Sequence, residues 1–361
     1  MSTQFISDES APDTARQYEH PSVWLGPDMA ARKDWVVQLD DDDIAQLEAA
    51  LAMVKAKGIG IPGMTSADFP LHGASARKMQ AVLLELEHGR GFALVRGLPV
   101  MRYTKRDASL IYWGLGTHFG HCVAQNAQGE VLGHVRNLGV DWASDQRARG
   151  YQTRDFLPYH VDSSDVVGLL CLRRARSAGI SRLVSSTALH NAIAASRPDL
   201  WKLLCEPFYV DRRSEEGPGR KPYYVTPCFN YLHGRLYVFF NFLIESAQRF
   251  PEVPRLTDAQ REALALMVTL ANDPAFYLEM DLEPGDMQFL CNYEILHSRT
   301  AYEDWPEPDR KRHLMRLWLR TPGFGQLPAA YADRASDIET WQRTPMQPIF
   351  DNSEIVSDLA D

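Results

Sequence analysis

The hydrophobic periodicity of this chain changes at about residue 121, and this change constrains the fold more than any other feature of the sequence. Upstream, apolar residues recur at helical spacing in residues 44–58, 74–91 and 105–120. Downstream, short runs rich in Val, Leu, Phe and Tyr alternate with turns that contain Gly, Pro or Asp. These runs are residues 132–139, 157–162, 166–172, 181–186, 227–232, 235–242, 276–282, 286–296 and 313–320. The second part of the chain is therefore predicted to consist mainly of short strands.

Helical patterns are sparse within this strand-rich part, where only residues 187–206 and 257–273 carry them. They are too few to supply a crossover for every pair of strands, which argues against a doubly wound parallel sheet. Many short strands instead favour a sandwich or barrel. The predicted class is α+β with an all-β core. The acidic residues 40–43 are expected to cap the first helix rather than to bind a metal.

The domain organisation predicted from composition is simple. No internal repeat or change in composition marks a second domain, so residues 21–340 are expected to form one unit that includes the N-terminal helices. Residues 1–20 are polar without periodicity, and residues 341–361 mix proline with acidic residues. Both ends are expected to be loosely held.

Net charge and cysteine usage exclude several classes of protein. The 38 basic and 47 acidic residues leave a net charge of −9, which repels nucleic acid and anionic lipid. No run approaches the roughly 18 to 20 apolar residues of a membrane span, and the N-terminus lacks the features of a secretory signal. The five cysteines include no CxxC pair and are expected to be reduced. A cytoplasmic protein is expected, and a homo-oligomer is left open.

A histidine and an aspartate stand two residues apart in the run at 157–162. Since side chains alternate along a strand, His160 and Asp162 are expected on one face, where both could bind one ion. A chain with 11 histidines and 47 acidic residues also contains such pairs by chance. The alternative is a histidine at a strand end that merely pairs with an acid.

A third metal ligand is available further along the chain. The turn Glu283-Pro284-Gly285-Asp286 leads into a strand, and His297 lies where the following apolar run meets polar residues. Two histidines and one carboxylate form the facial triad of non-haem Fe(II) oxygenases, which leaves three coordination positions open. Zinc would usually take four ligands.

Three arginines follow His297 on a predicted strand. Arg312, Arg316 and Arg320 are spaced by four residues and are expected on one face. Arginines on an otherwise apolar strand require an anion, because an unpaired buried guanidinium is costly. The alternative is a solvated outer face with internal salt bridges.

Taken together, HVD at 160–162, NYEILHSR at 292–299 and RHLMR at 312–316 resemble the taurine dioxygenase (TauD/TfdA) family. The resemblance extends over roughly residues 85–320 and implies a double-stranded β-helix, or jelly roll, flanked by helices. It implies that His160, Asp162 and His297 bind Fe(II), and that 2-oxoglutarate and O2 are co-substrates.

The same resemblance assigns residues to 2-oxoglutarate. Arg312 would pair with its far carboxylate, and Ser181 would share that carboxylate in a position where members often have Thr. Two departures are evident: the insert at 303–309 lengthens the gap before Arg312, so Arg316 could take its role, and Ala178-Gly179 replaces a pair of glycines. The implied reaction is oxidation of a C–H bond. The presence of a carboxylate ligand, Asp162, favours hydroxylation over halogenation.

Substrate residues are expected in the region where the family places them. Gln125, Asn126 and Trp113 are candidates, with Arg316 for an anionic group if Arg312 takes 2-oxoglutarate; core aromatics and a turn are the alternative. The substrate would be a small polar molecule such as a carboxylate, sulfonate or amino acid. The remaining histidines considered, His118, His121, His134 and His190, are expected to be structural. The rival functions are a jelly-roll binding protein without catalysis and a metal-dependent hydrolase of the cupin type.

Overall fold

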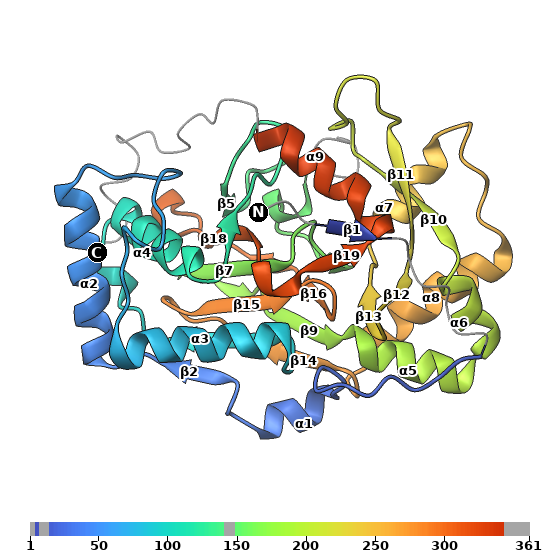
Figure 1. Ribbon diagram of the computed structural model, residues 1–361, viewed down its shortest axis with the longest axis horizontal. Coiled ribbons are helices and arrows are strands. Elements are labelled where there is room, and N and C mark those ends of the chain that lie inside the picture. Colours follow the sequence, from blue (N-terminus) through green and yellow to red (C-terminus); the bar gives the residue numbers. More distant parts are fainter. Residues whose placement is uncertain (1–3, 7–13, 141–148, 343–361) are drawn as a thin grey trace.

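The computed structural model describes residues 4–6, 14–140 and 149–342 (Figure 1). Most of the two ends predicted to be loose, residues 1–3, 7–13 and 343–361, therefore lies outside the described residues. Within them, β1 (Gln4–Ile6) pairs in parallel with β19 (Gln326–Pro328), so the N-terminal segment reaches the C-terminal part of the fold. No helix in these ranges is both long enough and apolar enough to span a membrane.

Two sheets form the core. The seven-stranded sheet has the order β2 (Val36–Gln38), β3 (Phe92–Arg96), β15 (Met287–Cys291), β7 (Val166–Arg173), β18 (His313–Arg320) and β4 (His121–Cys122), with β5 (Leu132–Val135) also paired to β18. The four-stranded sheet has the order β14 (Tyr277–Met280), β9 (Ser181–Ser185), β16 (Ile295–Arg299) and β6 (Leu157–His160). All pairs in both sheets are antiparallel except β2–β3.

Three helices at the predicted positions cover one side of the molecule (Figure 1): α2 (Asp41–Ala56), α3 (Gly73–Glu87) and α4 (Lys105–Thr117). The prediction that the acidic cluster caps the first of them is confirmed. The Asp40 side chain accepts from the Asp43 N–H, and the Asp43 side chain accepts from the Asp40 N–H.

Helix α4 and the residues just after it pack on the large sheet through aromatic side chains. The ring of Phe289 on β15 lies 4.8 Å from that of Phe119 and 6.2 Å from that of Tyr112. Such fully buried rings each stabilise the fold by roughly 2 to 3 kcal/mol. Gly168 on β7 permits this approach, because a Cβ there would lie 2.5 Å from the Tyr112 hydroxyl oxygen.

Four other helices gather at the opposite end (Figure 1): α5 (Ser186–Ser196), α6 (Pro198–Leu204), α7 (Leu243–Ser246) and α8 (Asp258–Ala271). Two hairpins lie beside them, β10 (Pro207–Asp211) with β11 (Tyr223–Pro227) and β12 (Phe229–Leu232) with β13 (Arg235–Val238). The remaining elements include the helices α1 (Gly26–Ala31) and α9 (Ala332–Gln342) and the two-residue strands β8 (Ser177–Ala178) and β17 (Tyr302–Glu303).

The predicted all-β core with flanking helices is confirmed. Among the described residues the two sheets form a jelly-roll core without closing into a barrel. All five cysteines are free, as expected. Strands lie in all of the predicted runs, but the run at 286–296 contains parts of two strands, β15 and β16, with a turn at 292–294 between them. Strands β10 and β11 were not predicted, because prolines stand at their ends.

Candidate active site

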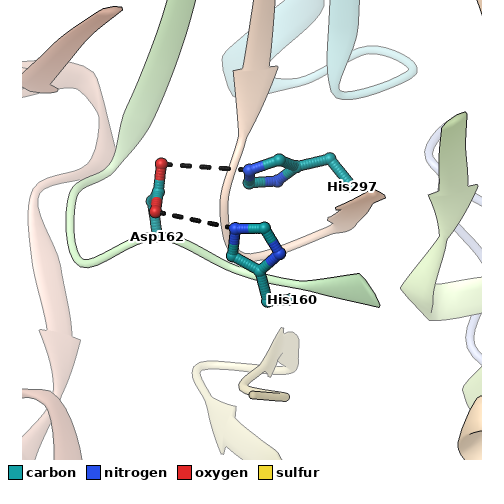
Figure 2. Close-up of side chains that lie close together, drawn as sticks. All are labelled: His160, Asp162 and His297. Carbon is teal, nitrogen blue, oxygen red and sulfur yellow. Dashed lines mark ion pairs between the residues drawn. The ribbon is translucent and has the colours of Figure 1, made fainter. Parts of the chain in front are cut away.

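Two histidines face each other across neighbouring strands of the small sheet. His160 ends β6, and His297 lies directly opposite it on β16, with ring centroids 4.3 Å apart. Asp162 completes the cluster (Figure 2): His160 Nε2 lies 3.9 Å from its Oδ1, and His297 Nε2 lies 3.8 Å from its Oδ2. One ligand atom from each residue lies within 4.8 Å of the others. The structure thus brings the three predicted metal ligands together.

The position of Asp162 differs from the expectation of a shared strand face. Strand β6 ends at His160, and Asp162 lies in the short loop that leads into the bend at 163–165. Asn292 positions this bend, because its side-chain oxygen accepts from the Asp162 N–H (3.0 Å) and its amide donates to the Ser164 carbonyl (2.9 Å). Asp162 therefore approaches His160 because the chain leaves the strand after His160, and not because the two residues share one face of a strand.

Both imidazoles are buried and prepared to bind a metal as neutral ligands. His160 Nδ1–H donates to the Pro158 carbonyl (2.8 Å), which leaves Nε2 with a free lone pair. Burial lowers the pKa of His160, and burial together with the neighbouring His160 lowers the pKa of His297 to about 3. The Nδ1 of His297 is buried without a hydrogen-bond partner.

The carboxylate of Asp162 is held in its charged form. Burial alone would raise its pKa, but the nearby Arg316 charge and the two histidines outweigh burial, so the pKa is lowered. The Trp318 indole N–H donates to Asp162 Oδ2 (2.9 Å), and Arg316 Nη1 lies 3.5 Å from the same oxygen. Two neutral nitrogens and one carboxylate on one side of a shared space fit an Fe(II) ion.

Arg316 is fixed by Gln125, one of the predicted substrate residues. Arg316 Nε donates to Gln125 Oε1 (2.8 Å), and the Gln125 amide donates back to the Arg316 carbonyl (2.8 Å). The ring of Tyr151 lies 4.6 Å from the guanidinium carbon of Arg316. Gln125 and Arg316 therefore form one unit beside Asp162.

The side chains of the other two predicted substrate residues bond to other parts of the protein. Asn126 closes a turn, where its side-chain oxygen accepts from the N–H groups of Gln128 and Glu130. The structure does not bring Trp113 to the triad: it is buried in the core, and its indole N–H donates to the Met64 carbonyl (3.1 Å). Both positions match the alternative of a turn and a core aromatic.

Arg312 lies apart from Arg316 at the start of β18. The strand register shifts between His313 and Leu314, so a bulge separates the two arginines. The Arg312 side chain is 6% exposed, and its Nη1 has no hydrogen-bond partner. Gly179 makes room for it with φ +76°, because a Cβ there would lie 3.2 Å from Arg312 Nε.

Ser181 lies two residues beyond Gly179 and is buried. Its hydroxyl is within hydrogen-bonding distance (3.2 Å) of the Gln288 side chain. Its Cα lies opposite that of Arg299 on β16. Ser181 and Arg312 therefore border the same corner of the core.

Arg299 was not identified from the sequence, although it follows His297 by two residues on a strand. It is 5% exposed, and its Nη1 also lacks a hydrogen-bond partner. The guanidinium carbon of Arg299 lies 4.7 Å from the Tyr302 ring centroid, and that of Arg312 lies 5.1 Å from it. Burial and then the Arg312 charge lower the pKa of Arg299 to about 10. Side chains two residues apart lie on the same face of a strand, so the spacing of Arg299 from His297 could have revealed it.

The remaining predicted groups have partners within the protein. Arg320 pairs with Asp165 (3.0 Å), which matches the alternative of an internal salt bridge. His118 bonds the Phe69 carbonyl (2.8 Å), and His190 bonds Tyr231 (2.7 Å). His121 is exposed on the two-residue strand β4.

A jelly-roll core that carries two neutral histidines and one carboxylate defines a non-haem iron oxygenase. A family model described as "Taurine catabolism dioxygenase TauD, TfdA family" matches residues 55–318, and the chain belongs to this family. It is 31% identical over 318 residues to FR-33289 synthase of Streptomyces rubellomurinus, which covers 86% of this chain and 92% of that protein. It is also 29% identical to a uridine-5'-phosphate dioxygenase of Amycolatopsis over 185 residues, 49% of this chain and 66% of that protein.

Solved structures share the fold. An asparagine oxygenase in complex with Fe(II), 3-hydroxyasparagine and succinate aligns with a TM-score of 0.59 at 18% identity, over 80% of this chain and 94% of that one. The oxygenase OrfP in complex with Fe and α-ketoglutaric acid aligns with a TM-score of 0.57 at 15% identity, over 79% of this chain and 93% of that one. The expected class is confirmed: the chain is an Fe(II)- and 2-oxoglutarate-dependent dioxygenase that acts on a small molecule.

Proposed function

We propose that this dioxygenase hydroxylates a C–H bond of a small anionic molecule, with iron on His160, Asp162 and His297. The observation that carries the proposal is the convergence of both Nε2 atoms on the Asp162 carboxylate at 3.8 and 3.9 Å. When bound, Fe(II) with 2-oxoglutarate and O2 supplies the oxidation, in which 2-oxoglutarate becomes succinate and CO2 and one oxygen atom enters the substrate.

Arg312 is the proposed anchor for the far carboxylate of 2-oxoglutarate. Its guanidinium is buried, has an unpartnered N–H and forms no ion pair with an acid of the described residues. Such a group requires an anion, and a carboxylate fits its planar fork. Ser181, at the same corner, would donate its hydroxyl to that carboxylate.

Arg316 is the proposed residue for an anionic group of the substrate. Gln125 fixes its guanidinium beside the ligand Asp162, so a substrate that it binds would lie next to the metal. Similar proteins are named for substrates with a carboxylate or a phosphate, such as asparagine and uridine-5'-phosphate. These names support an anionic substrate.

The rival functions explain less of this site. A binding protein without catalysis has no need for a buried arginine reserved for a second ligand. A hydrolase needs a general base near the metal. The two other acids nearest to the ligands in the sequence are already engaged. Asp165 accepts from Tyr293 and Arg320, and Glu294 pairs with Arg235 (2.8 Å), so neither is placed as that base.

Two variants test the proposed roles by titration of 2-oxoglutarate into the anaerobic Fe(II) protein, followed through the visible band of the chelated keto acid. We expect Arg312→Ala to raise the 2-oxoglutarate requirement at least about tenfold, because a bidentate contact in a dry pocket contributes more than about 1.4 kcal/mol. Arg316→Ala should retain the band and uncoupled turnover of 2-oxoglutarate but lose use of the primary substrate. Lysine should rescue neither variant fully.

The opposite pattern would transfer the anchor to Arg316. If iron binds to the wild-type protein but 2-oxoglutarate produces neither a band nor succinate in air, the proposed function is wrong.

A further inference from the structure

The corner of the core that Arg312 and Ser181 border contains a second buried arginine. Arg299 is the last residue of β16, and its Cα is paired with that of Ser181 on β9. Residues opposite each other in an antiparallel pair point to the same face of a sheet, and so do residues two apart on one strand. Arg299 therefore lies on the face that carries Ser181 and the metal ligand His297.

The charge of Arg299 is not neutralised by an acid. Within the described part of the chain it forms no ion pair, and its guanidinium donates to the backbone carbonyls of Asp155 and Thr300. Its Nη1 is buried without a partner. An uncompensated buried charge is costly, so this arrangement calls for an anion nearby.

Tyr302 brings Arg299 and Arg312 into the same corner, because both guanidinium carbons lie within 5.1 Å of its ring centroid. Asp304 is the acid whose charge acts on both arginines. Its Oδ1 accepts from the Arg312 backbone N–H (2.7 Å), and its Oδ2 is buried without a partner. Asp155 is also near Arg299, but it is exposed, so water screens its charge.

Two guanidinium groups and one carboxylate leave this corner with one net positive charge. The far carboxylate of 2-oxoglutarate carries one negative charge and would neutralise it. With Arg312 and Asp304 alone the corner would already be neutral, and a carboxylate would gain little there to offset its loss of water. The charge that attracts a second carboxylate is thus the one that Arg299 adds.

We propose that Arg299 is a specificity-determining residue for the co-substrate, whose charge selects keto acids with a second carboxylate over keto acids with one. This inference rests on the proposed function and adds a residue to its co-substrate site. A charge in a poorly hydrated corner acts across several ångströms. Arg299 therefore works without contacting the carboxylate that Arg312 and Ser181 would bind.

Arg182 supplies a matched control on the same sheet. It follows Ser181 on β9 and so points to the opposite face. Its guanidinium carbon lies 4.4 Å from the ring centroid of Tyr277, and it pairs with Glu279 (2.7 Å). Arg182 thus shares with Arg299 the contact with a tyrosine ring, but it has an acidic partner and lies on the other face.

Titration of two keto acids into the anaerobic Fe(II) protein, followed through the visible band, tests the proposal. 2-Oxoglutarate and 2-oxobutyrate chelate a metal through the same atoms, and only the first has a far carboxylate. We expect Arg299→Gln to weaken 2-oxoglutarate binding at least about tenfold and 2-oxobutyrate binding less than about threefold, because only the far carboxylate interacts with the lost charge. Arg299→Lys should recover most of the 2-oxoglutarate affinity, since it keeps the charge. Arg182→Gln should change neither affinity more than about twofold.

Asp304→Asn tests the same charge balance in the opposite direction. Asparagine keeps the oxygen that accepts from the Arg312 N–H and removes the negative charge, so 2-oxoglutarate should bind at least about threefold more tightly while 2-oxobutyrate binding stays the same. Damage to the fold would not produce such a gain. This variant therefore decides the matter even if Arg299→Gln does not fold.

Four results would overturn the proposal: unchanged 2-oxoglutarate affinity in Arg299→Gln, an equal loss for both keto acids, an equal loss in Arg182→Gln, or no gain in Asp304→Asn. The wild-type protein separates these results from failure of the proposed function. A band with 2-oxoglutarate and succinate formation in air would support that function whatever the variants show, whereas the absence of both would refute it.

Discussion

Two pairs of histidines meet across antiparallel strands in the described part of the chain, and only one of them lies with a carboxylate in a cluster that could hold a metal ion. His160 and His297 come from β6 and β16, with ring centroids 4.3 Å apart. His134 and His313 come from β5 and β18, with ring centroids 5.1 Å apart. Two adjacent imidazoles are therefore not sufficient for a metal site.

The direction of the ring nitrogens distinguishes the pairs. His134 Nδ1 and His313 Nε2 lie 2.8 Å apart and hydrogen-bond each other, so these nitrogens are already used. In the other pair, both Nε2 atoms face Asp162, and His160 Nδ1 is occupied by a backbone carbonyl. A third ligand, and a hydrogen bond that turns the lone pair toward it, separate a metal centre from a structural pair.

The largest expected effect comes from removing a ligand of the first pair. His297→Ala should lower activity by at least about 100-fold and abolish Fe(II) binding, since two ligands remain where three are needed. His134→Ala is the matched control, because it removes an imidazole that belongs to no cluster of three metal-ligating groups among the described residues. Metal binding measured by equilibrium dialysis should be lost in the first variant and kept in the second. An active His297→Ala protein would contradict the assignment of the ligands.

A smaller effect is expected from the hydrogen bond on the carboxylate ligand. Trp318→Phe removes the indole N–H that donates to Asp162 Oδ2 at 2.9 Å while keeping an aromatic ring in the core. Loss of such a partner typically weakens metal binding by about 10- to 100-fold, and we expect the lower end because Arg316 also lies near this oxygen. Competition with a metal chelator measures the change. Trp113→Phe is the control, since its N–H donates to Met64 in the core; equal effects of the two variants would refute the role of Trp318.

The sequence predicted the features of the proposed metal site that depend on local sequence pattern. Strands β6 and β16 lie in runs of apolar residues, and the residue types His160, Asp162 and His297 sufficed to propose iron. Trp318 could also have been identified, because it follows Arg316 by two residues on one strand and both side chains reach Asp162.

Other features depend on contacts between distant parts of the chain. Asp162 is positioned by Asn292, which is 130 residues away, so the sequence could not show that it lies beyond the strand end. Helix α9 has few apolar residues, and its Asp337 is buried against Arg212 and Arg220. Hydrophobic periodicity does not reveal a helix with so few apolar residues, which is why α9 was not predicted.

The smallest expected effect concerns the stability of the second pair at acidic pH. Burial lowers the pKa of His134 to about 4 and that of His313 well below its ordinary value of 6.5. Between pH 6.5 and 4 the unfolded chain therefore binds protons that the folded chain does not, so the free energy of unfolding falls as the pH falls through this window and is unaffected above it. Since His134 is partly exposed, we expect about 1 kcal/mol of this loss to come from it by pH 5.5.

His134→Gln isolates this contribution, because glutamine does not titrate and can still hydrogen-bond His313. Urea unfolding at pH 7.5 and 5.5, with chelator present to exclude metal effects at the triad, should show the variant losing about 1 kcal/mol less than the wild type on acidification. The triad histidines are present in both proteins, so their own acid sensitivity cancels in the difference. Equal losses of unfolding free energy in the two proteins would mean that His134 takes up its proton in the folded state. The contrast between the structural pair and the proposed metal-binding pair would then rest on ring orientation alone.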